Sequence, residues 1–167
     1  MADDRRWMGE ALKEAEKALA EGELPIGAVI VGSRSDILAR SRAADLAAGN
    51  RSSHAEIRAI IGSSFKGSRT AGMTIYTTLE PCVMCAAAIL IEGIERVVYS
   101  LEAPQDGGLF IFGDPHVRAR CMGAREPETA SGVMRTEAVA LFSRYLQLVP
   151  ERSPTAAFAR SVVQANS

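Results

Sequence analysis

The chain carries, at residues 74–100, the stretch TIYTTLEPCVMCAAAILIEGIERVVYS, which contains three consecutive elements of a predicted α/β fold. Residues 74–78 are all β-branched or aromatic, which predicts a strand. Residues 81–92 predict a helix with a proline near its first position, and Gly93 ends it. Residues 96–100 predict a second strand. A strand, a helix and a second strand in this order are typical of a parallel crossover unit.

The residues before this unit predict a helix, a hairpin and a short second helix. Apolar residues recur at helical spacing from Arg6 to about Ala20, with charged residues between them. Residues 26–31 form an apolar run rich in β-branched residues, and residues 36–39 read as a returning strand. The short helix is expected from about Ser53 to Ile61, capped by Ser52 or Ser53.

The residues after the unit predict fewer regular elements. Glycine and proline recur through residues 103–132, so we expect loops there and at most a weak strand. A last long helix is expected from about Met134 to Leu148. The residues from about Ser153 onward are expected either to fold back as a short helix or to form a frayed tail. Residues 1–167 are predicted to form one α/β domain with helices on both faces of a mixed sheet.

Composition and charge narrow the class of protein. Hydrophobic residues make up 47% and charged residues 23% of the chain, as in many soluble enzymes. There is no run of about eighteen apolar residues and no signal-peptide pattern, so we expect no membrane span and a cytoplasmic location. The net charge is −1, from 19 basic and 20 acidic residues, which argues against an extended nucleic-acid surface.

Three residues at two predicted helix starts have the chemistry of zinc ligands. His54 begins one helix, and Cys82 and Cys85 lie in the first turn of another. The spacing of the two cysteines places both on one helix face, and the helix N-terminus favours the thiolate form of a cysteine. An imidazole and two thiolates suit Zn²⁺ and leave a fourth tetrahedral position for water, as in catalytic zinc sites.

Glu56 follows His54 by two residues and is the predicted proton carrier. A carboxylate near zinc that is not a ligand can take a proton from water and deliver it to a substrate. Two alternatives compete with this interpretation, a redox pair and half of a structural zinc site. A redox pair leaves His54 and Glu56 unexplained, and a structural four-cysteine site needs a second pair, which Cys121 alone does not supply.

Four other residues are open to both a structural and a functional interpretation. Cys121 is expected to be a loop or packing residue rather than a ligand. His116 is either a surface residue or a substrate contact. Phe110 and Phe112 are either packing residues or parts of a pocket lid that stacks on a ring.

These motifs resemble the cytidine/deoxycytidylate deaminase superfamily, and within it the bacterial tRNA-specific adenosine deaminases and the guanine deaminases. The resemblance rests on LPIGAV at residues 24–29, HAE at residues 54–56 and TLEPCVMC at residues 78–85. It implies a three-layer α/β/α cytidine deaminase-like fold with a five-stranded mixed sheet, one Zn²⁺ per subunit and a homodimer. It also implies a base pocket, lined by Ile26, Ala55, Leu79, Glu80 and Pro81.

Two departures from the family bear on the substrate. Ala43 stands where the family usually has an asparagine that contacts the base or sugar, and the last long helix ends YLQLVP at residues 145–150, without the basic residues of the tRNA enzymes. We therefore expect water-dependent release of ammonia from a small nucleobase-like heterocycle or nucleoside, of the guanine or isoguanine, cytosine, adenine or triazine type. The alternative is a tRNA-specific adenosine deaminase that converts A to I at the wobble position. A third hypothesis, a zinc protein without activity, is disfavoured by Glu56.

Overall fold

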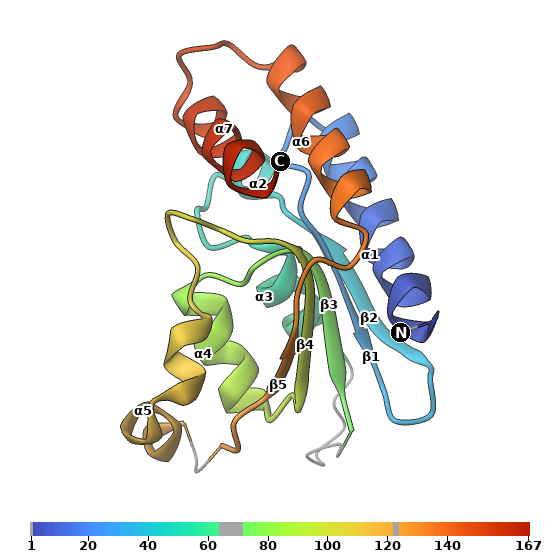
Figure 1. The fold of residues 1–167 in the computed structure, drawn as a ribbon, viewed down its shortest axis with the longest axis vertical. Coiled ribbons are helices and arrows are strands. Elements are labelled where there is room, and N and C mark those ends of the chain that lie inside the picture. Colours follow the sequence, from blue (N-terminus) through green and yellow to red (C-terminus); the bar gives the residue numbers. More distant parts are fainter. Residues whose placement is uncertain (1, 64–71, 122–123) are drawn as a thin grey trace.

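A mixed sheet of five strands, in the order β2-β1-β3-β4-β5, lies at the centre of the computed structural model (Figure 1). β1 (Gly27–Val31) pairs antiparallel with β2 (Ile37–Arg42) on one side and with β3 (Thr74–Leu79) on the other. β4 (Arg96–Leu101) runs parallel to β3, and β5 (Glu128–Ala130) runs parallel to β4. The predicted hairpin, the parallel crossover unit and the five-stranded mixed sheet are therefore confirmed.

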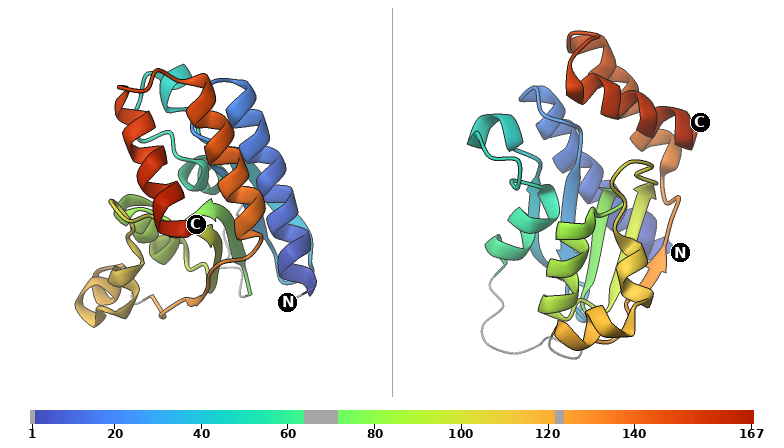
Figure 2. Two further views of the ribbon diagram at one scale, coloured as in Figure 1. Left: turned by 45° about the horizontal axis from the view of Figure 1, so that its top comes forward. Right: turned by 90° about the vertical axis from the view of Figure 1, so that its left-hand side faces the viewer.

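Helices cover both faces of the sheet, which confirms the three-layer α/β/α architecture (Figures 1 and 2). On one face lie α1 (Ala2–Ala20), α6 (Arg135–Leu148) and α7 (Pro154–Asn166). On the other face lie α3 (Ala55–Gly62) and α4 (Val83–Glu92). All five residues of β1 are buried, and successive side chains enter different cores because a strand alternates its faces. Val29 and Val31 pack against the first set of helices, whereas Ala28 and Ile30 pack against the second set.

The structure describes residues 2–63, 72–121 and 124–167, and in these ranges it corrects two local expectations and decides a third. The predicted caps are wrong, because His54 rather than Ser52 or Ser53 is the N-cap of α3. The stretch predicted as loops contains a 3-10 helix η1 (Leu109–Gly113), a helix α5 (Pro115–Arg120) and β5; within it, residues 122–123 lie outside the described ranges. The residues after Ser153 form α7, so of the two alternatives expected there the helix is confirmed.

A further short helix, α2 (Asp45–Ala48), was not predicted. Within the described part of the chain, no helix is both long and apolar enough to span a membrane.

A buried charge cluster joins the start of α1 to the sheet. Two nitrogens of Arg96 donate to the carboxylate of Asp4 at 2.6 and 3.1 Å, and the hydroxyl of Tyr76 donates to the same carboxylate at 3.0 Å. The hydrogen bonds from Arg96 lower the pKa of Asp4 more than burial raises it. Because the folded-state pKa lies below the unfolded-state value, Asp4 stabilises the fold at neutral pH, and this contribution is lost as the pH falls through the folded-state pKa.

We expect Asp4→Asn to lower the free energy of unfolding by about 1.5–3 kcal/mol at neutral pH, the range for hydrogen bonds to charged groups. The difference from the wild type should shrink as the pH falls below about 4. Urea unfolding across this pH range measures both effects. Asp3→Asn, an exposed neighbour in the same helix turn, is the control. An Asp4→Asn protein as stable as the wild type at neutral pH would contradict the prediction.

Candidate active site

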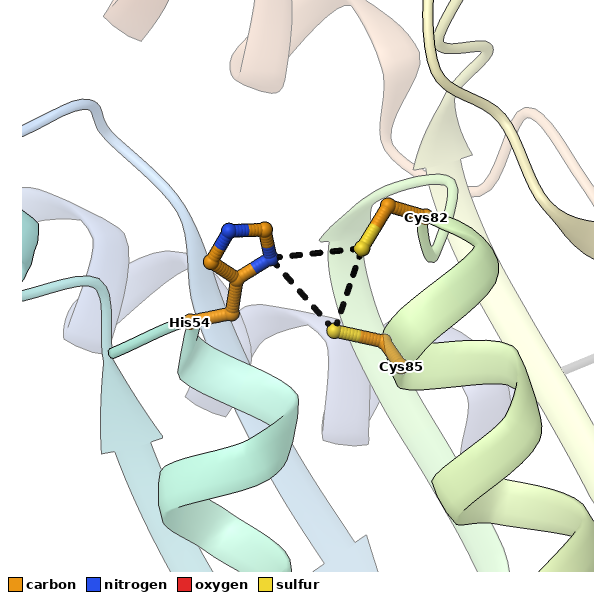
Figure 3. A group of neighbouring side chains, drawn as sticks. All are labelled: His54, Cys82 and Cys85. Carbon is orange, nitrogen blue, oxygen red and sulfur yellow. Dashed lines mark hydrogen bonds between the residues drawn. The ribbon is translucent and has the colours of Figure 1, made fainter. Parts of the chain in front are cut away.

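The three predicted ligands converge from two helix starts. His54 is the N-cap of α3, Cys82 is the N-cap of α4, and Cys85 is buried in the first turn of α4. Figure 3 shows the imidazole and the two sulfurs pointing toward one another across the gap between the helices. Antiparallel β1 and β3 lie side by side, and α3 and α4 pack on the same face of the sheet, so residues distant in sequence meet here.

The distances among the ligand atoms fit a tetrahedral zinc ion. Nδ1 of His54 lies 3.4 Å from Sγ of Cys82 and 3.5 Å from Sγ of Cys85, and the two sulfurs are 3.6 Å apart. Zinc bonds of about 2.3 Å to sulfur and about 2.0–2.1 Å to nitrogen, at tetrahedral angles, set ligand atoms about 3.5–3.8 Å apart. The three side chains are thus positioned to bind a metal ion, and their donor set is that of a zinc site.

The ionisation of the three groups also suits a divalent cation. The pKa of Cys82 is lowered to about 4, chiefly because Cys85 donates a hydrogen bond to its sulfur. The same contact, together with burial, raises the pKa of Cys85. The pKa of His54 is raised to about 9, first by its hydrogen bond with Cys82. At neutral pH Cys82 is therefore a thiolate, whereas His54 and Cys85 carry protons that a bound cation would displace.

Glu56, the predicted proton carrier, lies beside the ligands without being one of them. It is the second residue of α3 and is almost fully buried, with 3% of its surface exposed. The hydroxyl of Thr77 donates to its Oε1 at 3.1 Å, and Sγ of Cys85 lies 3.5 Å from its Oε2. Burial raises the pKa of Glu56. A carboxyl group with a raised pKa next to a metal site is suited to accept a proton and release it again.

A cavity of about 680 Å³ opens beside these residues. His54, Glu56 and Cys82 line it, so the metal site and the proton carrier face a space large enough for a ring-shaped ligand. Four of the residues that the resemblance assigns to the base pocket also line the cavity: Ile26, Ala55, Leu79 and Glu80.

Four residues considered for substrate binding lie elsewhere. Pro81 is not among the residues that line the cavity. Phe112 is buried in the core under α4, with 2% of its surface exposed, whereas Phe110 is 73% exposed on η1. His116 lies on the surface of α5. None of these four side chains borders the cavity. The two phenylalanines miss it because η1 packs on α4 and carries Phe112 inward and Phe110 outward.

One wall of the cavity is the segment that contains α2, which the sequence analysis missed. Ala43, Asp45 and Leu46 line the cavity from this segment. The carboxylate of Glu23, itself 2% exposed, accepts hydrogen bonds from the backbone N–H groups of Leu46 (3.1 Å) and Ala47 (2.7 Å). Glu23 thus caps a helix start that has no local side-chain cap. A buried carboxylate in a chain segment distant from the helix cannot be recognised as its cap from sequence alone.

Two glycines let the loop after β4 pack closely against the start of α4, where Cys82 lies. The backbone N–H of Gly108 donates to the carbonyl oxygen of Pro81 at 2.8 Å, and Gly107 forms an isolated bridge with Cys82. A Cβ atom at Gly108 would lie 2.3 Å from the backbone nitrogen of Val83, and one at Gly107 would lie 2.6 Å from the carboxylate of Glu80. At position 108 only glycine permits this approach, because the added atom would meet the backbone of Val83, whereas at position 107 the Glu80 carboxylate would have to shift. The neighbouring Gln105 and Asp106 line the cavity.

Residues 1–101 match the protein family described as the cytidine and deoxycytidylate deaminase zinc-binding region. The chain is 40% identical over 110 residues to the tRNA-specific adenosine deaminase of Bacillus subtilis (strain 168), covering 64% of this chain and 67% of that protein. It is 33% identical over 149 residues to the tRNA-specific adenosine deaminase of Haemophilus influenzae, covering 86% of this chain and 83% of that protein.

Two solved structures have a similar fold. The first comes from a study of A-to-I editing by tRNA:A34 deaminases at the wobble position of transfer RNA; it has a TM-score of 0.72 and 33% identity, and covers 81% of this chain and 98% of that chain. The second is a guanine deaminase from Nitrosomonas europaea, with a TM-score of 0.67 and 21% identity, covering 84% of this chain and 83% of that chain. At that identity the second likeness concerns the fold alone.

Proposed function

Because the chain belongs to the cytidine and deoxycytidylate deaminase family, and is thus a hydrolytic deaminase with a zinc-binding domain, we propose that adenosine in tRNA is its first candidate substrate. The observation that carries this proposal is the similarity to proteins named tRNA-specific adenosine deaminase, one of which the chain covers over 83% of its length. These relatives favour the function that the sequence analysis placed second.

A second candidate is a small amino-substituted base or nucleoside, and the composition of the cavity favours it. Ala43 lines the cavity with a methyl group that offers no hydrogen bond to a sugar or base. The carboxylates of Asp45, Glu80 and Asp106 also line the cavity, against a single arginine, Arg51. An enzyme that grips RNA phosphates needs clustered positive charge, which this surface lacks among the lining residues.

Both candidates share one reaction at the site. His54, Cys82 and Cys85 would hold the zinc, which when bound makes water nucleophilic at neutral pH. The Glu56 carboxylate would accept a first proton from water and deliver it to the ring nitrogen. It would then take the second proton from the hydroxyl group added at the ring carbon and deliver it to the departing amino group, so that both protons of the water are accounted for. Thr77 orients the carboxylate through its hydrogen bond to Oε1. Water and the ring amine are consumed, and the ring carbonyl compound and ammonia are formed.

A direct comparison of substrates tests the proposal. The zinc-loaded enzyme is incubated with an anticodon stem-loop that has adenosine at the wobble position, and inosine is measured by mass spectrometry. Ammonia release is measured in parallel from adenine, guanine, isoguanine, cytosine, their nucleosides and aminotriazines. Inosine formation faster than any small-molecule turnover supports the first candidate, and the reverse order supports the second. No turnover of either kind would refute both.

We further propose that the enzyme is a homodimer that buries the outer face of α4. Three apolar side chains of this helix region are exposed, Val83 (47%), Met84 (37%) and Ile91 (48%), and Phe110 on the adjoining η1 is exposed at 73%. Exposed apolar groups that gather on one helix face are typical of protein interfaces. The family resemblance implies a homodimer, so the partner that covers this face would be a second copy of the chain.

Ile91→Glu should therefore convert the dimer to a monomer in light scattering at micromolar concentration, because the charge would be buried without a partner. Leu148→Glu changes a residue of α6 that is 68% exposed on the opposite layer, and should leave the mass unchanged. A wild-type protein that is monomeric, or an Ile91→Glu dimer as tight as the wild type, would contradict the interface.

A further inference from the structure

Helix α7 contributes a wall of the cavity beside the metal ligands. Pro154, Thr155 and Phe158 line the cavity from the first two turns of this helix. Phe158 is half-buried, because it also packs against the core that α1 and α6 form with the sheet. Among the lining residues Phe158 alone carries a benzene ring, and the other apolar ones are aliphatic. A planar aromatic surface therefore borders the space where the ring of a substrate would lie.

The far end of α7 is held in place by the side chain of Asn166, which is 6% exposed. Its Oδ1 accepts the backbone N–H of Glu102 at 2.9 Å, and its Nδ2 donates to the backbone carbonyl of Glu102 at 3.0 Å. Arg135 donates to the same Oδ1 at 2.8 Å and forms an ion pair with Glu102 at 2.7 Å. These contacts tie the C-terminal end of α7 to the end of β4 and the start of α6.

We propose that α7 is a ring-binding wall, in which Phe158 stacks on the flat face of the substrate ring and Asn166 acts as a positioning residue for it. The inference rests on the proposed function, since it requires a heteroaromatic ring in the cavity. Base–aromatic stacking contributes substantially to nucleobase affinity and tolerates different rings, because every base has a π-face. The aliphatic wall of Ile26 and Leu79 fits such a ring by shape, whereas Phe158 adds the stacking contact.

Ring binding without turnover tests the wall directly. Zinc-loaded Glu56→Gln protein is titrated by calorimetry with adenine, guanine, cytosine and their nucleosides, and the tightest of these probes is kept. Adding Phe158→Ala should raise its Kd about tenfold, as for loss of a stacking contact. Adding Val163→Ala, which trims another partly buried residue of α7 that does not line the cavity, should change Kd less than twofold. An unchanged Kd with Phe158→Ala, or a parent protein that binds none of the probes, overturns the proposal.

The positioning role of Asn166 is tested by combining variants. Asn166→Ala should raise the probe Kd several-fold in the presence of Phe158 and have little further effect with Phe158→Ala, because it acts through that ring. Asn166→Asp keeps the oxygen that accepts from Glu102 and Arg135, and should restore most of the affinity. In the active enzyme, these substitutions should raise KM with little change in kcat. Additive effects of the two alanine substitutions would refute the positioning role. Probe binding without turnover of any substrate would instead count against the proposed function and leave the wall intact.

Discussion

Glu56→Gln is expected to lower kcat by about 10²–10⁴-fold, the usual contribution of general acid–base catalysis, while zinc stays bound. Glutamine preserves the shape of the side chain and can still accept the hydrogen bond from Thr77, so the buried packing is kept. It removes the carboxylate whose Oε2 lies 3.5 Å from the sulfur of Cys85. The loss should therefore appear in turnover and not in folding or metal content.

The measurement pairs steady-state kinetics on the best substrate with elemental analysis of the same preparation. Glu16→Gln, a swap of an exposed glutamate on α1, is the matched control and should retain wild-type turnover. A Glu56→Gln enzyme with full zinc and a kcat within a few-fold of the wild type would rule Glu56 out as the proton carrier. Loss of zinc together with activity would show instead that Glu56 supports the metal site.

Cys82→Ala is expected to abolish high-affinity zinc binding and, with it, all measurable turnover. Removing Cys82 leaves two ligands, His54 and Cys85, where the tetrahedral site needs three from the protein. Because metal binding contributes to the free energy of folding, the thermal unfolding midpoint of the purified variant should also fall and should no longer respond to chelator.

Zinc per subunit, measured by elemental analysis after dialysis, gives the direct result: about one in the wild type and close to none in Cys82→Ala. Cys121→Ala is the control, because Cys121 ends α5 and is not part of the ligand group. Full zinc occupancy in Cys82→Ala would remove Cys82 from the ligand set, and loss of zinc in Cys121→Ala would add a ligand that the structure does not place there.

The parts of the molecule that could be predicted from sequence are those in which local spacing determines geometry. The strands at residues 74–79 and 96–101 and the helix between them follow from residue type and periodicity within one stretch. The ligand set could be predicted for the same reason, since Cys82 and Cys85 share one helix turn. His54 joined them by its chemistry and by resemblance rather than by any local pattern.

The remaining features depend on contacts between distant segments. The cap of α2 is Glu23, whose sequence separation from Leu46 gives no local signal. Asp114 followed by Pro115 has the pattern of a capped helix start. The many glycines and prolines around it nevertheless led to a prediction of loops, so α5 was not predicted. Ser153-Pro154 likewise marks the start of α7, but its place against the cavity depends on tertiary contacts, among them the packing of Phe158 on the core and the hydrogen bonds of Asn166 with Glu102.

The metal ligands and the ring-binding wall on α7 are also synthesised at different times. Protein synthesis proceeds from the N-terminus, and the ligands lie between residues 54 and 85, whereas α7 comprises residues 154–166. The ribosome therefore completes the ligand set, and the strands that carry it, before α7 exists. The order of the segments along the chain thus places the synthesis of the metal ligands before the synthesis of the helix that we propose as the ring-binding wall.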